Sequence, residues 1–226
     1  MLWAVVPAAG RGARMDAGQP KQYLPLGGRT VIEHALTPLL DYPELETLVV
    51  VLGPDDRSFH DMEVASHPIL KTTTGGASRA DSVLAGLRAL REAADDDLVL
   101  VHDAARPCLR VDDLDRLIRV ARRSRDGALL AVPAKDTLKR VVDGRVGATL
   151  ARDDVWQAQT PQVFPVAALR KALEQGDRAL ITDESSAMEA AGFRPRCVEG
   201  HGDNLKVTYL DDLPLAEASL RAQGRL

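Results

Sequence analysis

The chain alternates between short apolar runs and segments in which apolar residues recur at helical spacing. Continuous apolar runs of strand length predict strands that are buried on both faces of a sheet. These runs lie at residues 2–6, 47–52, 98–102 and 128–133, and a further strand is predicted at 69–73, before Gly75-Gly76. Apolar positions spaced three or four residues apart are typical of amphipathic helices. Helices are predicted near residues 31–40, 80–90 and 114–121.

The helix near residues 31–40 has the clearest start signal. Thr30 and Glu33 have the spacing of a capping box, in which each side chain binds the backbone N–H of the other residue. Pro38 should limit the far end of this helix, since proline cannot continue a helical hydrogen-bond ladder.

The pattern changes after residue 133. Residues 137–142 and 146–150 flank Asp143-Gly144, a strong signal for a β-hairpin. The two strands are too polar to form a core of their own, so we expect this arm, at about residues 135–153, to pack on a second subunit in a homodimer. Helices are then predicted at residues 166–175 and 182–192, a strand at 196–199, and a last helix around 213–220.

Strands and helices that alternate at close intervals are typical of an α/β fold. We predict a Rossmann-like, mostly parallel sheet with helices on both faces and the β-hairpin as an arm for dimerisation. The chain has 226 residues, of which 45% are hydrophobic, a size that suits one domain over residues 1–226.

Composition excludes some classes of partner. The net charge is −4 and cations are interspersed with anions, so we expect no binding to nucleic acid. The apolar stretch at residues 2–9 is too short for a membrane span, and we expect no membrane association. Only Cys108 and Cys197 are present, without metal-type spacing, which fits a reducing cytoplasmic setting. Because the chain stops after the last helix, we expect no fused downstream enzyme.

Residues 5–24, VVPAAGRGARMDAGQPKQYL, join the first strand to a loop rich in small and cationic residues. Small residues let backbone N–H groups approach an anion, and nearby cations suit a polyphosphate. The small residues are Ala8, Ala9, Gly10 and Gly12, and the cations are Arg11, Arg14 and Lys21. By itself the spacing also fits an ordinary glycine loop with solvated cations.

Two known phosphate-binding loops do not match. The loop lacks Gly-Lys-Ser/Thr, and the dinucleotide motif would need a third glycine where Met15 stands. Ligands of parallel sheets bind beyond the carboxyl ends of the strands. The glycine loop, Gly75-Gly76 and Asp103–Arg106 all follow predicted strands, so we expect them to converge on one crevice.

Several stretches, spread in order over nearly the whole chain, match one family. They are PAAGRGARM, PKQYL, GGASRADSVLAGL, VHDAARP, KDTLK, TPQVF, ITDESSAME and DNLKVT. With them the chain resembles the 2-C-methyl-D-erythritol 4-phosphate cytidylyltransferases of the non-mevalonate route to isoprenoid precursors. The resemblance implies a nucleotidyltransferase in which the phosphate of methylerythritol phosphate attacks the α-phosphorus of CTP in line. The products would be CDP-methylerythritol and pyrophosphate, and the cofactor Mg²⁺ or another divalent cation.

The resemblance also implies roles for single residues. The catalytic positions are Arg14, Lys21, Arg152 and Lys206. The nucleotide-binding positions are Ala8, Ala9, Gly10, Gly12, Gly76 and Ser82. The positions that bind methylerythritol phosphate are Asp103, Arg106, Thr137, Arg152, Thr160 and Thr182. The metal candidates are Asp103 and Asp203. In the implied homodimer, Thr137 and Arg152 would act at the site of the neighbouring subunit.

Some of these residues have a simpler interpretation. Ser82 alone would be a polar residue on the outer face of a helix, and Lys206 a surface lysine. Asp103 could be a turn residue that pairs with Arg106. We expect His102 to be a packed residue at a strand end and not a catalyst. At Ala77 relatives often carry an acidic residue, so we expect backbone contacts only at this position.

Two other functions are considered. A relative could activate another polyol phosphate, such as ribitol 5-phosphate, with CTP; the arm and the Thr160 region favour methylerythritol phosphate. A non-catalytic nucleotide-binding protein is a third possibility. The combination of Arg14, Lys21, Asp103 and Lys206 argues against it, because binding alone does not require cations around both reacting phosphates.

Overall fold

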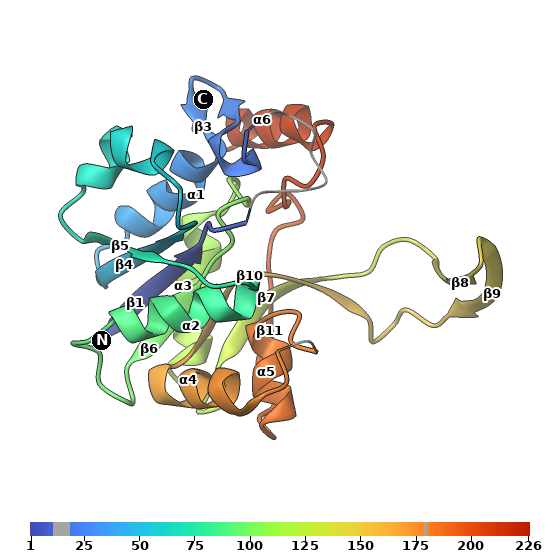
Figure 1. Cartoon of the computed structure of the whole chain (residues 1–226). Coiled ribbons are helices and arrows are strands. Elements are labelled where there is room, and N and C mark those ends of the chain that lie inside the picture. The colour runs from blue at the N-terminus through green and yellow to red at the C-terminus, as the bar shows by residue number, and fades with distance from the viewer. Residues whose placement is uncertain (11–18, 179) are drawn as a thin grey trace.

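The body of the molecule is a seven-stranded sheet between two layers of helices (Figure 1). This computed structural model describes residues 1–10, 19–178 and 180–226. The strands, in spatial order, are β11 (Arg196–Glu199), β7 (Ala128–Pro133), β10 (Trp156–Pro165), β6 (Leu98–Val101), β1 (Leu2–Pro7), β4 (Leu45–Leu52) and β5 (Leu70–Thr74). Of these described strands, only β10 runs antiparallel to its neighbours. The predicted α/β class is confirmed.

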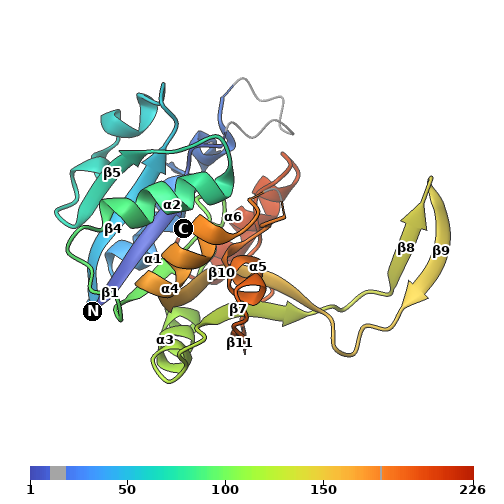
Figure 2. The same cartoon turned by 60° about the horizontal axis from the view of Figure 1, so that its bottom comes forward.

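Strand β1 shows why helices cover both faces. Successive side chains of a strand point to opposite faces of the sheet. On one face Ala4 and Val6 join the apolar cluster of α1 (Val31–Leu40) and α3 (Val111–Ala121). On the other face Trp3 and Val5 join the cluster of α2, α4 and α5, which span Arg79–Ala89, Val166–Gln175 and Glu184–Ala190. Figure 2 shows α2 and α4 in this second layer.

Helix α2 lies close on the sheet because residue 86 is glycine. A Cβ atom at Gly86 would lie 2.4 Å from Cγ1 of Val5 and 2.9 Å from Cγ2 of Val51, so a side chain at this position would push the helix outward. This close packing brings the first turn of α2 to the carboxyl end of β1, where the glycine loop begins.

The capping box predicted for α1 is present. Thr30 Oγ1 accepts from the N–H of Glu33, and the Glu33 carboxylate accepts from the N–H of Thr30. Pro38 lies inside the last turn, and the helix ends two residues later, at Leu40. A third, smaller apolar cluster joins the start of α1 to α6 (Asp212–Ala222). Short elements complete the body: β2 (Pro25–Leu26), β3 (Arg29–Thr30), and the 3-10 turns η1 (Lys21–Tyr23), η2 (Ser58–Asp61) and η3 (Glu63–Ser66).

Strand β10 was not predicted from the sequence pattern. Its sequence, WQAQTPQVFP, contains a proline and several glutamines, and both features argue against a central strand. The buried glutamines are accommodated by hydrogen bonds: Nε2 of Gln162 donates to Asp183, and its Oε1 accepts from the N–H of Ser185. This pairing attaches β10 to the start of α5.

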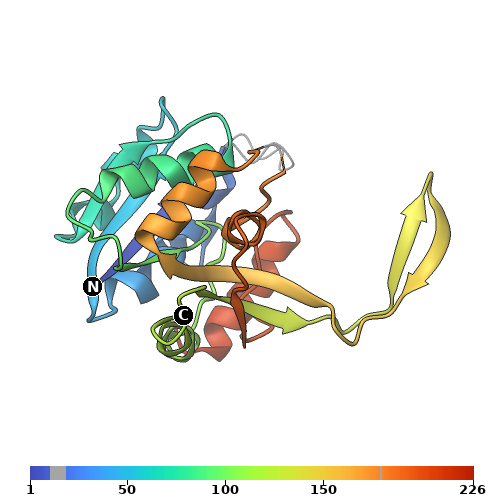
Figure 3. The same ribbon diagram turned by 90° about the horizontal axis from the view of Figure 1, so that it is seen from below.

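The predicted hairpin forms an arm of β8 (Leu138–Val142) and β9 (Arg145–Leu150) that projects from the body between β7 and β10 (Figures 1 and 3). At its turn, Asp143 and Gly144 have φ angles of 50° and 75°, and a two-residue hairpin turn of type I′ needs positive values at both positions. Residues 139–150 are all exposed, so the arm has no core of its own. Within the described ranges no helix combines the length and the apolar character that a membrane span requires.

Candidate active site

A cavity of about 400 Å³ opens at the carboxyl ends of β1 and β6, within the usual size range of small-molecule sites, roughly 300–1,000 Å³. The expected convergence of loops at this edge is confirmed. The cavity is lined by the ends of both strands, the first turn of α2, and the segment before α6. The lining residues singled out from the sequence are Ala8, Ala9, Gly10, Lys21, Gly76, Ser82, Asp103 and Lys206.

The chain after β1 is held from two sides. The N–H of Ala8 donates to the carbonyl of Val51 at 2.8 Å, which continues the sheet ladder. The buried Gln22 side chain donates from Nε2 to the carbonyl of Ala8 at 2.8 Å and lies 3.4 Å from that of Gly10. The N–H of Ala9 points away from the Ala8 carbonyl, because the two groups of a peptide unit are oppositely directed. Gly12 and Arg14 lie outside the described residues.

The first turn of α2 supplies one wall of the cavity. Ser78 caps the helix by accepting from the N–H of Asp81, and Ser82 Oγ donates to the carbonyl of Ser78 at 3.0 Å. Ser82 is only 3% exposed and lines the cavity, so its interpretation as a residue on the outer helix face is wrong. A helix N-terminus carries a partial positive charge, which suits a phosphorylated ligand.

Asp103 lies directly after β6 among three cations. Arg79 donates to Oδ1 from Nη2 at 3.0 Å, while Lys206 Nζ is 2.7 Å and Arg106 Nε 3.6 Å from Oδ2. Burial by itself would raise the pKa of Asp103, but Arg79, Lys206 and Arg106 together outweigh it and hold the pKa well below its usual range. Asp103 is therefore an ionised carboxylate, and Lys206 is not simply a surface lysine.

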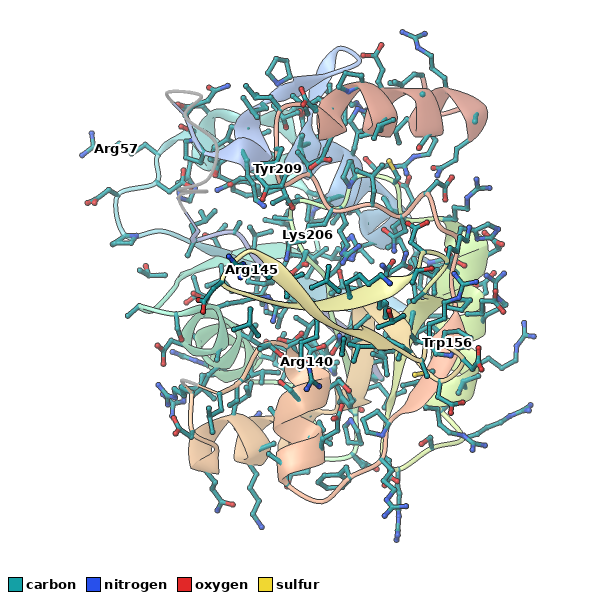
Figure 4. All side chains as sticks on the ribbon, turned by 90° about the vertical axis from the view of Figure 1, so that its right-hand side faces the viewer. Arg57, Arg140, Arg145, Trp156, Lys206 and Tyr209 are labelled. Carbon is teal, nitrogen blue, oxygen red and sulfur yellow. The ribbon has the colours of Figure 1, made fainter. Side chains whose placement is uncertain are left out.

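Lys21 tethers η1 to the segment before α6. Its Nζ donates to the carbonyl of Val207 at 2.8 Å, while the residue also lines the cavity. Figure 4, which views the molecule from the side of the arm, shows Lys206 on the body and Arg140 and Arg145 on the arm. The cavity thus has lysines from two distant parts of the sequence on its wall.

His102 and Thr160 lie behind the cavity. Thr160 Oγ1 accepts from the N–H of Asp103 and is 3.0 Å from Nδ1 of His102, whose Nε2 is 3.1 Å from the Arg106 carbonyl. Burial lowers the pKa of His102 to about 4, so the ring is neutral near pH 7. The neutral ring holds the turn after β6 in place through its hydrogen bonds. The expectation that His102 is a packed strand-end residue is confirmed. Thr160 is buried, and both contacts hold its hydroxyl toward the turn and not among the cavity-lining atoms.

The remaining sequence-predicted residues do not line this cavity. Arg106 donates to the Asn204 carbonyl at 2.7 Å, and Thr182 is exposed with its hydroxyl 3.4 Å from Ser186 Oγ. Thr137 is exposed at the base of the arm, and Arg152 donates to the Lys135 carbonyl. Asp203 binds Arg110 and Gln223 and is not brought together with Asp103.

Two charged residues of the site were missed by sequence reasoning. Arg79 lines the cavity, and its guanidinium also binds Glu184, a carboxylate that is 1% exposed at the start of α5. Helical periodicity gives no signal for such a contact between two helices. The signal that was available is location, since both residues lie inside stretches that carry the family resemblance, GGASRADSVLAGL and ITDESSAME.

A mostly parallel α/β sheet with a cationic cavity beyond its strand ends, formed by a small-residue loop and a helix N-terminus, is the architecture of a nucleotide-binding protein. The sequence matches the family model described as 2-C-methyl-D-erythritol 4-phosphate cytidylyltransferase over residues 2–222. The chain belongs to this family.

Individual relatives agree with the family match. The chain is similar to the 2-C-methyl-D-erythritol 4-phosphate cytidylyltransferase of Tolumonas auensis, with 51% identity over 97% of this chain and 96% of that protein. It is 54% identical to the protein of the same name from Pseudomonas fluorescens, over 94% and 92% of the two chains. Its fold is similar to the crystal structure of the Francisella tularensis enzyme of that name, with a TM-score of 0.86, 35% identity, and coverage of 97% and 99%.

Proposed function

We propose that this chain transfers the cytidylyl group from CTP to 2-C-methyl-D-erythritol 4-phosphate, the reaction after which its family is named. The observation that carries the proposal is the cavity beyond β1 and β6, where Lys21, Lys206 and the first turn of α2 surround a space of nucleotide size. Membership of the family supplies the identity of both substrates.

The chemistry required is the meeting of two anions. An oxygen of the methylerythritol phosphate forms a bond to the α-phosphorus of CTP, and the bond from that phosphorus to the bridging oxygen breaks as pyrophosphate leaves. No covalent nucleophile on the protein is needed, because positioning and fixed positive charge carry most of such a transfer. Lys21 and Lys206 supply fixed charge, and the N–H groups of the glycine loop and of α2 supply neutral donors.

Magnesium is part of the proposal. Among the described residues that line the cavity, Asp103 is the only carboxylate, and Mg²⁺ is commonly held by one or two carboxylates together with substrate phosphates and water. Asp103 would be its protein ligand, and the bound ion would neutralise charge on the triphosphate. Asp103→Asn should lower turnover and raise the Mg²⁺ concentration needed for half-maximal turnover, and an unchanged Mg²⁺ dependence would remove Asp103 from the metal site. Full turnover in excess chelator would contradict the metal requirement.

The experiment that tests the reaction is pyrophosphate release with a matrix of nucleotides and polyol phosphates. CTP with methylerythritol phosphate should give turnover well above CTP with ribitol 5-phosphate or UTP with either acceptor. A Lys206→Ala preparation, purified in the same way, controls for contaminating enzymes. Higher turnover with ribitol 5-phosphate would favour the alternative acceptor, and CTP binding without turnover on any acceptor would favour a nucleotide-binding protein.

A homodimer through the arm completes the proposed site. Val141, Val142 and Val146 on the arm are each more than half exposed, and exposed apolar side chains on a hairpin without a core of its own are typical of a surface that packs on another chain. Twofold symmetry would then bring Thr137 and Arg152 of each subunit to the cavity of the other. The exposed Cys197 and the buried Cys108 are both free thiols, which suits a reducing compartment such as the cytoplasm.

Mixed dimers test the shared site. Lys21→Ala and Arg152→Ala are prepared separately, each expected to be nearly inactive, and are mixed under conditions of subunit exchange. In a mixed dimer one site carries both lesions and the other neither, so random exchange should restore about a quarter of all sites. If labelled subunits exchange and activity stays at the level of the parents, Arg152 does not act across the interface.

A further inference from the structure

Arg79 joins two buried carboxylates that come from different parts of the fold. Its Nε and Nη2 donate to Oδ1 of Asp103 at 3.2 and 3.0 Å. On the other side Nη1 donates to Oε1 of Glu184 at 2.6 Å and Nη2 to Oε2 at 3.0 Å. The planar guanidinium of Arg79, with its fork of N–H donors, thus binds one carboxylate on each side. A lysine could not reproduce this arrangement.

Glu184 is a fixed anchor for this fork. It is 1% exposed, and both of its carboxylate oxygens are bound by Arg79. Its two neighbours in the chain are held by Gln162 of β10, which binds the side chain of Asp183 and the N–H of Ser185. Although Arg79 lines the cavity, its guanidinium cannot turn from Glu184 toward a ligand without leaving that carboxylate buried and unpaired.

The fork determines how Asp103 is oriented. Arg79 occupies Oδ1, so Oδ2 is the oxygen that faces Lys206 at 2.7 Å. The N–H of Asp103 is fixed in turn by Thr160. Both the backbone and the carboxylate plane of this residue are therefore held before any ligand arrives.

Glu184 also determines the charge that a ligand meets. The cluster contains three cationic side chains and two carboxylates. The cations are Arg79, Arg106 and Lys206, and the carboxylates are Asp103 and Glu184. Because Glu184 neutralises Arg79, the excess positive charge remains with Lys206 and Arg106. A cation whose donors are spent on two carboxylates is poorly suited to bind phosphate as well.

We propose that Arg79 is a positioning residue: anchored by its counter-ion Glu184, it holds Asp103 in the orientation that the reaction needs, and it does not itself bind the phosphates of CTP. The inference rests on the proposed function. It assigns a role to a pair of residues that connects α2, on the nucleotide side of the cavity, with α5, which follows Thr182.

The test compares Arg79→Gln, Arg79→Lys and the double variant Arg79→Gln/Glu184→Gln with the wild type. Affinity for CTP is measured by calorimetry, and kcat and KM by pyrophosphate release. The expected result is a fall in kcat of about 10²-fold, because Asp103 would lose its fixed orientation and a small misplacement in an active site has an effect of that size. The affinity for CTP should be nearly unchanged. Arg79→Lys should recover part of kcat, since it keeps the charge but cannot bridge both carboxylates.

A matched control lies on the same helix. Arg88 pairs with Glu174 at 2.9 Å, but both side chains are largely exposed, so Arg88→Gln removes an Arg–Glu pair without touching the cavity. Its kcat and CTP affinity should equal those of the wild type. The double variant guards against misfolding, because Arg79→Gln alone leaves Glu184 buried without a partner, whereas two amides can bond to each other.

Three results separate the possibilities. If CTP affinity falls as much as kcat/KM while kcat is kept, Arg79 binds phosphate directly and the inference is overturned. If folded Arg79 variants, the double variant included, have wild-type kcat and only a lower Tm, the pair is merely structural and the inference is likewise overturned. An inactive wild type would overturn the proposed function instead, so the two failures are distinguishable.

Discussion

Gln22 should be as important for nucleotide binding as a residue that contacts the nucleotide. It lies in η1, is 4% exposed, and holds the carbonyl groups of Ala8 and Gly10 on the glycine loop. We predict that Gln22→Glu weakens CTP binding although the shape of the side chain is kept. A carboxylate cannot donate to the two carbonyls and would repel them, so the loop would lose its prepared arrangement.

The magnitude follows from the two contacts. The 2.8 Å bond to Ala8 contributes about 1 kcal/mol, and an unsatisfied buried carbonyl adds about 1–3 kcal/mol, since Ala8 is 4% exposed. The 3.4 Å contact to the exposed Gly10 adds little. A loss of about 2 kcal/mol from the bound state corresponds to about 30-fold weaker binding.

Calorimetric titration with CTP measures this loss, and urea unfolding measures how much of it is general stability. Gln19→Glu is the matched control, because the Gln19 side chain is exposed and its Nε2 lies 3.5 Å from the Tyr23 carbonyl. The control should bind CTP within about twofold of the wild type. Wild-type CTP affinity in a folded Gln22→Glu variant would refute the reasoning, since the glycine loop would then need no support from η1.

Three further predictions concern single residues. Lys21→Ala should lower kcat by roughly 10²–10³-fold with the fold intact, because it removes a fixed donor from the proposed phosphate site, and near-normal turnover at saturating CTP would contradict this. Gly86→Ala should cost about 1–3 kcal/mol in urea unfolding, since its Cβ would lie 2.4 Å from Val5, and an unchanged midpoint would contradict the packing argument. His34 is 2% exposed and burial lowers its pKa below 6.5, so the unfolded chain binds the proton more readily and stability should fall as pH drops below about 6.5. His34→Gln should flatten that fall, whereas parallel pH curves of the two proteins would exclude this role.

Most of the fold could be predicted because its elements have strong local signals. The strands β1, β4 and β6 are continuous apolar runs, and α1 begins at a capping box. Strand β10 lacked such a signal, since its buried glutamines are tolerated only because Asp183, Ser185 and other distant groups bond to them. A pattern of single residues cannot reveal a partner that lies elsewhere in the chain.

In the site, too, some features could be predicted from local sequence signals and others could not. The loop after β1 and Asp103 after β6 could be placed at one edge, because parallel strands end on the same side of a sheet. The inward position of Ser82 and the Arg79–Glu184 pair depend on how α2 is rotated and how α5 docks. Thr137 is exposed at the base of the arm and Arg152 binds the Lys135 carbonyl, so within a single chain neither reaches the cavity, and their predicted roles depend on the proposed second subunit.

The pairing of β6 with β10 has a consequence for the life of the enzyme in a cell. It joins strands from the first half of the chain to strands from the second, and Asp103 and Thr160 bond across that seam. A chain whose second half has not yet folded therefore has no complete nucleotide pocket. CTP would bind only the fully folded molecule. At a CTP concentration of about 100 times the Kd, binding would add about 2.7 kcal/mol to the free energy of unfolding of both halves together. Cleavage by a protease should slow equally in the two halves as CTP rises, so the lifetime of the protein would follow the supply of its own substrate.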